Sequence, residues 1–168
     1  MDFVSVVFDN KIEVDLLKLQ LITFRNVNID IVNTLFILFN DNKHKLSKWL
    51  DDLLECCPAN LRWKIQFIFP SDLVVLPKGE VYVSNWYSQQ FTKLAVSKII
   101  STKHYVVLDA KNHFISPITH ETFFREDGKI KLYQETHNDD LLNFYSNCFR
   151  YFGLDDIEKH NPFTSPCY

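Results

Sequence analysis

Residues 3–9 read FVSVVFD, an apolar run that ends in an acidic residue. Three later segments repeat this pattern: residues 35–41 (LFILFND), 65–72 (IQFIFPSD) and 105–109 (YVVLD). Continuous apolar runs of this length are typical of strands that are covered on both faces, because neither side of such a strand carries enough polar groups to face water. We therefore predict four buried strands, at residues 3–8, 35–39, 65–69 and 105–108, each followed by a short polar residue.

Helix-like segments lie between these strands, at residues 14–24, 43–57 and 86–103. The third has the clearest apolar face, which we expect to pack on the core and which consists of Tyr87, Phe91, Leu94, Ala95 and Ile99. The alternation of strands and helices predicts an α/β, Rossmann-like fold, with a mainly parallel central sheet and helices on both faces. A D-G turn within residues 124–133 predicts a C-terminal hairpin, and residues 138–152 predict a final helix that Gly153 ends.

The composition indicates one compact domain and excludes several classes of function. The chain has 168 residues, of which 46% are hydrophobic, and its formal net charge of -3 gives no basic footprint for nucleic acid. No apolar run is long enough to span a bilayer, and the N-terminus lacks the basic region of a secretory signal. The four cysteines show neither zinc-ligand nor disulfide-framework spacing, which favours reduced thiols in the cytoplasm.

The glycines exclude the common phosphate-binding loops. Gly79, Gly128 and Gly153 lie far apart, so neither G-x-G-x-x-G nor G-x-x-x-x-G-K-[ST] can be written anywhere in the chain. A phosphorylated ligand must therefore be bound through a metal, through lysine or arginine side chains, or at a helix N-terminus without a glycine motif.

Acidic residues that follow the four predicted strands suggest where a site lies. Ligands of open parallel sheets bind outside the carboxyl ends of the strands. The acidic residues expected at this edge are Asp9, Asp41, Asp72 and Asp109. The richest segment is residues 105–115, YVVLDAKNHFI, which brings a carboxylate, an ammonium group and an amide together within four residues. An acidic strand end followed by a solvated turn explains the same pattern equally well.

Two motifs carry a family resemblance. The segment W-x-x-Q-Q-x-x-K-L at residues 86–94 leads into the strand that carries L-D-A-K-N at residues 108–112, and the predicted hairpin follows. This combination resembles a family of bacterial glycosyltransferase-like proteins with the GT-A fold, over most of the chain and most strongly over residues 72–135. The resemblance implies a single GT-A-like domain over residues 1–168. It also implies transfer of a sugar from a nucleoside-diphosphate sugar donor to a polysaccharide or lipid-linked glycan acceptor.

The resemblance places L-D-A-K-N at the position of the D-x-D motif, whose carboxylates hold a divalent cation on the donor diphosphate. Asp109 takes the first position and is the implied ligand of Mg²⁺ or Mn²⁺. Lys111 takes the second position, where a positive charge disfavours a metal but can act as a point charge on the diphosphate. Asp109 and Lys111 are thus the candidate catalytic residues, with a metal-dependent and a metal-independent mechanism both open.

Further residues are expected to line the donor site by the same resemblance: Asp9, Asn10, Asp41, Gln90, Lys93 and Asn112. Each also has an ordinary structural explanation. Aspartate and asparagine are common at helix N-caps and turns, and polar residues three positions apart on a helix commonly face solvent.

Two other groups are weaker candidates. His113 and His120 are seven residues apart and have no third ligand in a known metal motif, so we expect no metal site there. Cys56 and Cys57 have no neighbouring basic residue to lower a thiol pKa, so we expect structural roles for both.

The acceptor half of a GT-A enzyme is expected to be short or missing, because little sequence follows Gly153. The chain is then a fragment, a truncated product or a minimal variant that works with a partner, and we assign no catalytic base. The main alternative is a non-catalytic α/β module for nucleotide binding or assembly. Nucleotidyl transfer is less favoured, because residues 9–11 (DNK) do not form a glycine-rich basic loop after the first strand.

Overall fold

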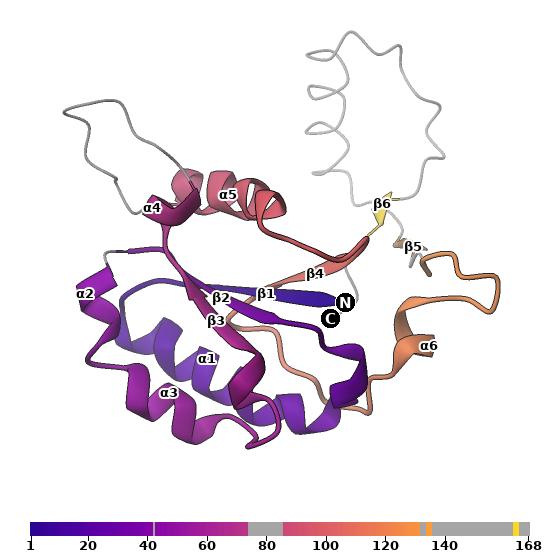
Figure 1. Cartoon of the computed structure of the whole chain (residues 1–168), viewed down its shortest axis with the longest axis horizontal. Coiled ribbons are helices and arrows are strands. Elements are labelled where there is room, and N and C mark those ends of the chain that lie inside the picture. The colour runs from indigo at the N-terminus through magenta and orange to yellow at the C-terminus, as the bar shows by residue number, and fades with distance from the viewer. Residues whose placement is uncertain (42, 74–85, 132–133, 136–162, 165–168) are drawn as a thin grey trace, which may run out of the picture. The chain divides into compact units, whose positions relative to one another are not determined.

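The computed structural model describes residues 1–41, 43–73, 86–131, 134–135 and 163–164 (Figure 1). The chain divides into two compact units, Met1–His120 and Glu121–Tyr168. Among the helices in these ranges, none is long and apolar enough to cross a membrane.

In the described residues, a four-stranded and wholly parallel sheet forms the centre of the first unit. The strands are β1 (Asp2–Val7), β2 (Leu35–Phe39), β3 (Ile65–Ile68) and β4 (Tyr105–Asp109). In register, Phe3 of β1 lies opposite Leu35 of β2 and Val106 of β4. The α/β fold with a parallel sheet is therefore confirmed, and each predicted strand is correct to within one residue at either end.

The order of the strands in the sheet is β3-β2-β1-β4. After β1, the chain adds β2 and β3 on one side of it and then returns to add β4 on the other side. The direction of winding thus reverses between β1 and β4, and this position is the topological switch point of the sheet.

Helices cover both faces of this sheet (Figure 1). One face carries α1 (Lys11–Thr23) and α3 (Leu50–Cys56), and Ser5 of β1 hydrogen-bonds to Gln20 of α1 there. The other face carries α4 (Pro70–Leu73) and α5 (Trp86–Ala95). Its buried core consists of Val4, Val6, Phe36, Leu38, Leu73, Ala95 and Val96.

Short helical segments complete the first unit: η1 (Phe24–Asn26), η2 (Ile29–Ile31), α2 (Lys43–Leu46), η3 (Arg62–Lys64) and η4 (Val96–Lys98). An aromatic cluster joins the end of α1 to the segment after β4. Phe3, Phe24 and Phe114 pack edge to face, with ring centroids 5.0 to 6.3 Å apart. The chain beyond β4 is therefore anchored on the α1 face of the sheet.

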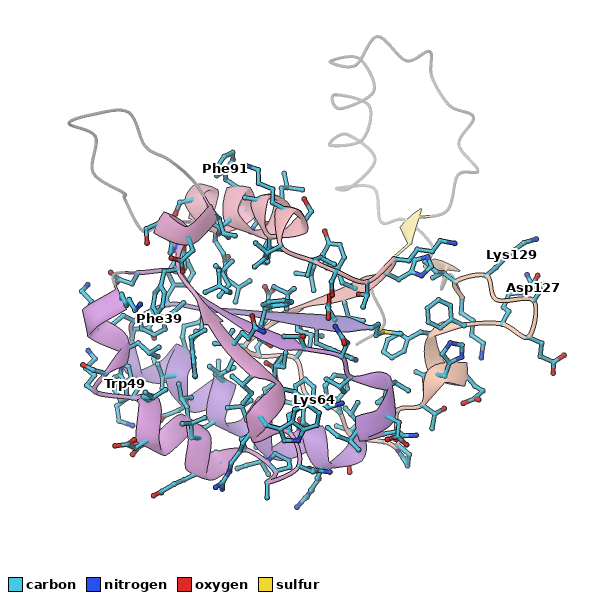
Figure 2. All side chains as sticks on the ribbon, viewed as in Figure 1. Phe39, Trp49, Lys64, Phe91, Asp127 and Lys129 are labelled. Carbon is cyan, nitrogen blue, oxygen red and sulfur yellow. The ribbon has the colours of Figure 1, made fainter. Side chains whose placement is uncertain are left out.

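The second unit contains the predicted hairpin. Phe124 and Ile130 form an antiparallel bridge, and Gly128 in the turn has a φ of 76°, in the left-handed region that favours glycine. Figure 2 shows Asp127 and Lys129 at the tip of this turn. The other elements at this end of the chain are α6 (His120–Phe123), β5 (Gln134–Glu135) and β6 (Phe163–Thr164). The final helix predicted for residues 138–152 lies outside the described residues.

The single helix predicted for residues 43–57 is wrong, because the segment divides into α2 and α3, which a turn at residues 47–49 separates. The Trp49 indole N–H donates to Asp9 Oδ1 at 2.9 Å, and Lys48 pairs with the same carboxylate. At this break in the helix, Lys48 and Trp49 thus bind the Asp9 carboxylate at the end of β1. The helix predicted for residues 86–103 ends early, at Lys98, because the backbone N–H groups of Ser101 and Thr102 donate to the carboxylate of Asp2.

The buried face predicted for α5 is also partly wrong. Ala95 is buried as expected, but Phe91 and Leu94 are 54% and 73% exposed, and Figure 2 shows Phe91 directed away from the sheet. The helix buries Thr92 instead, whose hydroxyl donates to backbone carbonyls of its own helix and so remains hydrogen-bonded. The side chain of Tyr87 lies outside the described part of the chain.

Candidate functional site

The end of β4 forms a closed turn that carries three of the predicted site residues. The Asn112 N–H donates to the Asp109 carbonyl oxygen at 2.9 Å, and the Asp109 N–H donates to Asn112 Oδ1 at 2.7 Å. Asn112 therefore holds the turn together through its backbone and its side chain. Lys111 lies exposed within the turn, and no other described residue forms a hydrogen bond or ion pair with its ammonium group.

The two motifs of the sequence meet at this turn. Lys93 of α5 lies 2.5 Å from Asp109, measured from Nζ to Oδ1, as a hydrogen-bonded ion pair. The Lys93 side chain is only 18% exposed and that of Asp109 is 38% exposed, so solvent only partly screens the pair. The lysine of Q-Q-x-x-K-L thus directly neutralises the aspartate of L-D-A-K-N.

The other motif side chain on α5 is less closely involved. Gln90 Nε2 donates to Gln89 Oε1 at 3.4 Å, and neither glutamine hydrogen-bonds to the β4 turn within the described set of contacts. Of the two donor-site residues predicted on α5, Lys93 therefore binds Asp109, whereas Gln90 has no described hydrogen bond to the β4 turn.

At the end of β1, Asp9 lies in a cationic cluster that the sequence did not indicate. Its carboxylate accepts from Lys48 at 2.8 Å and from the Trp49 indole at 2.9 Å, and Lys45 lies 3.8 Å away. Burial by itself raises the pKa of Asp9. The hydrogen bonds from Lys48 and Trp49 and the two lysine charges outweigh this effect, so the pKa is lowered and the carboxylate stays ionised.

The remaining predicted residues at this edge have identifiable structural partners. Asn10 caps α1, because its Oδ1 accepts the Glu13 N–H at 2.9 Å. Asp41 follows β2 and pairs with Lys45 at 2.9 Å, so Lys45 connects the ends of β1 and β2. Asp72 accepts the N–H of Phe69, at the start of α4.

The geometry brings Asp9 and Asn10 to the end of β1 and the Asp109–Asn112 turn to the end of the adjacent strand β4. Both groups lie where the strand order reverses, and the segments that follow the two strands both pack on the α1 face of the sheet. Asp41 and Asp72 follow β2 and β3 and lie progressively farther from this position. The best-supported candidate site is therefore the place where the carboxyl ends of β1 and β4 lie next to each other. We call it the edge between β1 and β4.

The donor set at this edge does not fit a divalent cation. The Lys93 ammonium group occupies Oδ1 of Asp109, and a hard cation requires several oxygen ligands that are free of competing positive charge. Within the ranges that the structure describes, no group of three or more histidine, cysteine or acidic side chains is placed to hold a metal. The arrangement is instead suited to an anion.

Sequence reasoning missed several residues that build this edge. They are Ser5, Gln20, Lys45, Lys48 and Trp49. The available signal was a polar residue at a core position, because Ser5 interrupts an apolar strand and Gln20 lies among the buried leucines of α1. The lysines gave no such signal, since a lysine on a helix usually faces solvent.

The histidine and cysteine candidates have ordinary environments. The His113 ring lies 3.4 Å from the Leu16 carbonyl oxygen, measured from Nε2. Cys57 is buried, and burial raises the pKa of its thiol to about 11, which leaves it protonated and unreactive. The Cys57 thiol also donates to the Pro58 carbonyl oxygen at 3.6 Å.

Comparison with known protein families gives a single finding. Residues 3–163 match DUF6492, a family of unknown function. The chain belongs to this family. The match covers both motifs of this DUF6492 protein and all of the parallel sheet except Asp2, the first residue of β1, so the edge between β1 and β4 is part of the family's domain. No curated protein sequence matches the chain.

Proposed function

We propose that this DUF6492 protein is a glycosyltransferase that binds a nucleoside-diphosphate sugar at the edge between β1 and β4. The observation that carries the proposal is the meeting of the two motifs at one point, where Lys93 neutralises Asp109. Lys111 supports it as well, because this exposed lysine follows the same strand at the switch point of a Rossmann-like sheet.

The charge balance favours binding of a diphosphate without a metal. Lys93 and Asp109 cancel each other, so the exposed ammonium group of Lys111 contributes the net charge of the turn. An ammonium group acts as a point charge on phosphate oxygens and stabilises the negative charge that develops on a diphosphate leaving group. In this proposal Lys111 has the role that a D-x-D cation has in the metal-dependent mechanism.

The proposed reaction breaks the bond between the anomeric carbon of the sugar and the diphosphate oxygen. A hydroxyl oxygen of the acceptor, which we propose to be a polysaccharide or a lipid-linked glycan in the cytoplasm, forms the new bond to that carbon. The electron pair of the broken bond leaves with the diphosphate, near Lys111. The acceptor proton passes to a base that we do not assign to any described residue.

A thermal-shift measurement with UDP, GDP, CDP, CMP and dTDP, in EDTA and in Mn²⁺, tests donor binding. At a ligand concentration of about 100 times Kd, binding stabilises the fold by roughly 2.7 kcal/mol. For a chain of this size, that corresponds to a rise in Tm of roughly 5–10 °C. We expect one diphosphate to raise Tm in EDTA. If no nucleotide shifts the Tm of a well-folded sample in either condition, the proposal fails.

Two lysines at opposite ends of β4 provide a matched comparison. Lys111→Ala is expected to weaken binding of that nucleotide by about tenfold or more, because a hydrogen bond to a charged group is worth about 1.5–3 kcal/mol. Lys103 is also exposed but precedes β4, at the opposite edge of the sheet, so Lys103→Ala should leave the affinity unchanged. Equal losses in both variants would indicate a nonspecific charge effect.

The second candidate function is a non-catalytic module for nucleotide binding or assembly. The neutralisation of both Asp9 and Asp109 by lysines favours it, because neither carboxylate is left free for proton transfer. A chain that binds a nucleoside diphosphate, but neither hydrolyses nor transfers the sugar from any matching donor, would have this function instead.

A further inference from the structure

We infer that Gln20 is a positioning residue that fixes the Asp109–Asn112 turn and thereby places the ammonium group of Lys111. This inference rests on the proposed function for its ligand but not for its geometry. Gln20 is fully buried on α1, and neither motif contains it. A buried glutamine on the core-facing side of a helix is costly unless its amide is hydrogen-bonded, so its partners indicate what it does.

The side-chain amide of Gln20 binds both ends of the turn. Its Nε2 donates to the Asp109 carbonyl oxygen at 2.8 Å and to the Asn112 carbonyl oxygen at 2.8 Å. These two carbonyl groups lie on either side of Lys111 in the sequence. One side chain from α1 therefore clamps the backbone on both sides of the lysine.

The orientation of the amide follows from its partners. Backbone carbonyl oxygens only accept hydrogen bonds, so both hydrogens of Nε2 are directed at the turn. The Gln20 Oε1 then faces the buried hydroxyl of Ser5 on β1, which donates to it. All the hydrogen-bonding groups of the amide are thus used to connect β1, α1 and the end of β4.

Other contacts from α1 hold the chain after the turn. The Phe114 N–H donates to Thr23 Oγ1 at 3.2 Å, and Asn26 Nδ2 donates to the Phe114 carbonyl oxygen at 2.6 Å. The Phe114 ring packs on Phe24. The segment after the turn is therefore anchored independently of Gln20, so loss of Gln20 is expected to loosen the turn without releasing the whole segment.

Such a clamp matters for an ammonium group that binds a phosphate without a metal. A lysine side chain is flexible, and its charge is effective only if the backbone that carries it is already in place. A rigid turn also reduces the entropy lost when the ligand binds. Gln20 thus preorganises the turn that carries Lys111, the group that takes the role of the D-x-D cation in the proposed function.

The test compares four forms of the full-length chain: wild type, Gln20→Met, Ser5→Ala and Thr102→Val. Gln20→Met retains the approximate volume and removes all three hydrogen bonds of the amide. Ser5→Ala removes only the contact to β1 and leaves the clamp on the turn. Thr102→Val removes hydrogen bonds of Asp2 at the opposite edge of the sheet and is the control for a general loss of stability.

Two measurements are made on each form, of which the first needs no ligand. Hydrogen exchange of the Asp109 and Asn112 amides reports on the turn. We expect both amides to be protected in wild type and in Ser5→Ala, and to exchange about tenfold faster or more in Gln20→Met. Fast exchange of both amides in wild type would overturn the inference even if Gln20→Met does not fold.

The second measurement is the affinity for inorganic pyrophosphate, the group that all nucleoside diphosphates share. We expect Kd to rise about tenfold in Gln20→Met and to stay at the wild-type value in Thr102→Val. A wild-type Kd in Gln20→Met, or an equal rise in Thr102→Val, would overturn the positioning role. If wild type binds neither pyrophosphate nor any nucleotide, the proposed function fails, and amide exchange alone still decides whether Gln20 fixes the turn.

Discussion

The ion pair between Lys93 and Asp109 can be measured directly with a double-mutant cycle. The variants are Lys93→Met, Asp109→Asn and the combination of both. The pair is hydrogen-bonded at 2.5 Å, and its side chains are 18% and 38% exposed, so it is intermediate between a surface and a buried ion pair. We expect a coupling free energy of about 1 kcal/mol, because surface pairs give about 0.2–1 kcal/mol and buried pairs cost more to break.

The assay is urea unfolding of the four proteins, followed by circular dichroism. Each single replacement leaves one charged group without its partner, so the double replacement should destabilise the fold by less than the sum of the two. The coupling should decrease in 1 M NaCl but persist, because solvent only partly screens the pair. Additivity within about 0.3 kcal/mol at low salt would refute the assignment of this contact as a stabilising pair.

The same Asp109→Asn variant distinguishes the two mechanisms of diphosphate binding. In the metal-independent mechanism, the substitution releases Lys93 and adds one net positive charge near Lys111. Affinity for the nucleoside diphosphate in EDTA should then increase by a factor of about 2 to 10. In the metal-dependent mechanism, Asp109→Asn removes the carboxylate that binds the metal, and the nucleoside diphosphate no longer binds. A loss of affinity that Mn²⁺ in excess restores would therefore contradict the proposal.

Three further predictions concern the scaffold. The pKa of Asp2 is lowered, because hydrogen bonds from Asn33, Ser101 and Thr102 outweigh the opposing effect of burial. The ionised Asp2 carboxylate therefore stabilises the fold near neutral pH, and this stabilisation is lost as pH falls below about 4. Unfolding measured against pH should show a smaller acid-dependent loss in Asp2→Asn than in wild type. Asn10→Ala should lower the free energy of unfolding by about 1 kcal/mol, because alanine cannot accept the Glu13 N–H at the start of α1. Asn10→Asp should keep the wild-type free energy of unfolding, because aspartate caps a helix as well as asparagine does. Cys57 should resist iodoacetamide at pH 8 and react only after unfolding, as mass spectrometry of the labelled peptide can show, because its thiol pKa is about 11.

The sheet could be predicted from the sequence because its signal is local. Each strand is a short apolar run, and the polar residue that follows marks its carboxyl end. The helices were less predictable, since their ends depend on contacts from distant parts of the chain. The carboxylate of Asp2 ends the helical segment before β4, and the carboxylate of Asp9 accompanies the division at Trp49.

The candidate site was predictable in position but not in its interactions. The alternation of strands and helices predicts a parallel sheet, so the acidic residues that follow the four strands could be placed at one edge in advance, whereas the adjacency of β1 and β4 is seen only in the structure. The partners of those residues could not be identified, because Lys48 lies 39 residues from Asp9 and Gln20 lies 89 residues from Asp109. The spacing of apolar residues predicts whether such side chains face the solvent or the core, but it does not indicate which groups they bind.

The pairing of charges at this edge has a consequence for the ligand. Lys48 and Lys45 bind Asp9, Lys45 also binds Asp41, and Lys93 binds Asp109. Of the four acids that the sequence placed at the carboxyl ends of the strands, Asp9, Asp41 and Asp109 are therefore already neutralised by lysines of the same fold. Because a metal site needs carboxylates without such partners and an anion site needs a cation, the exposed Lys111 on its clamped turn favours a negatively charged ligand.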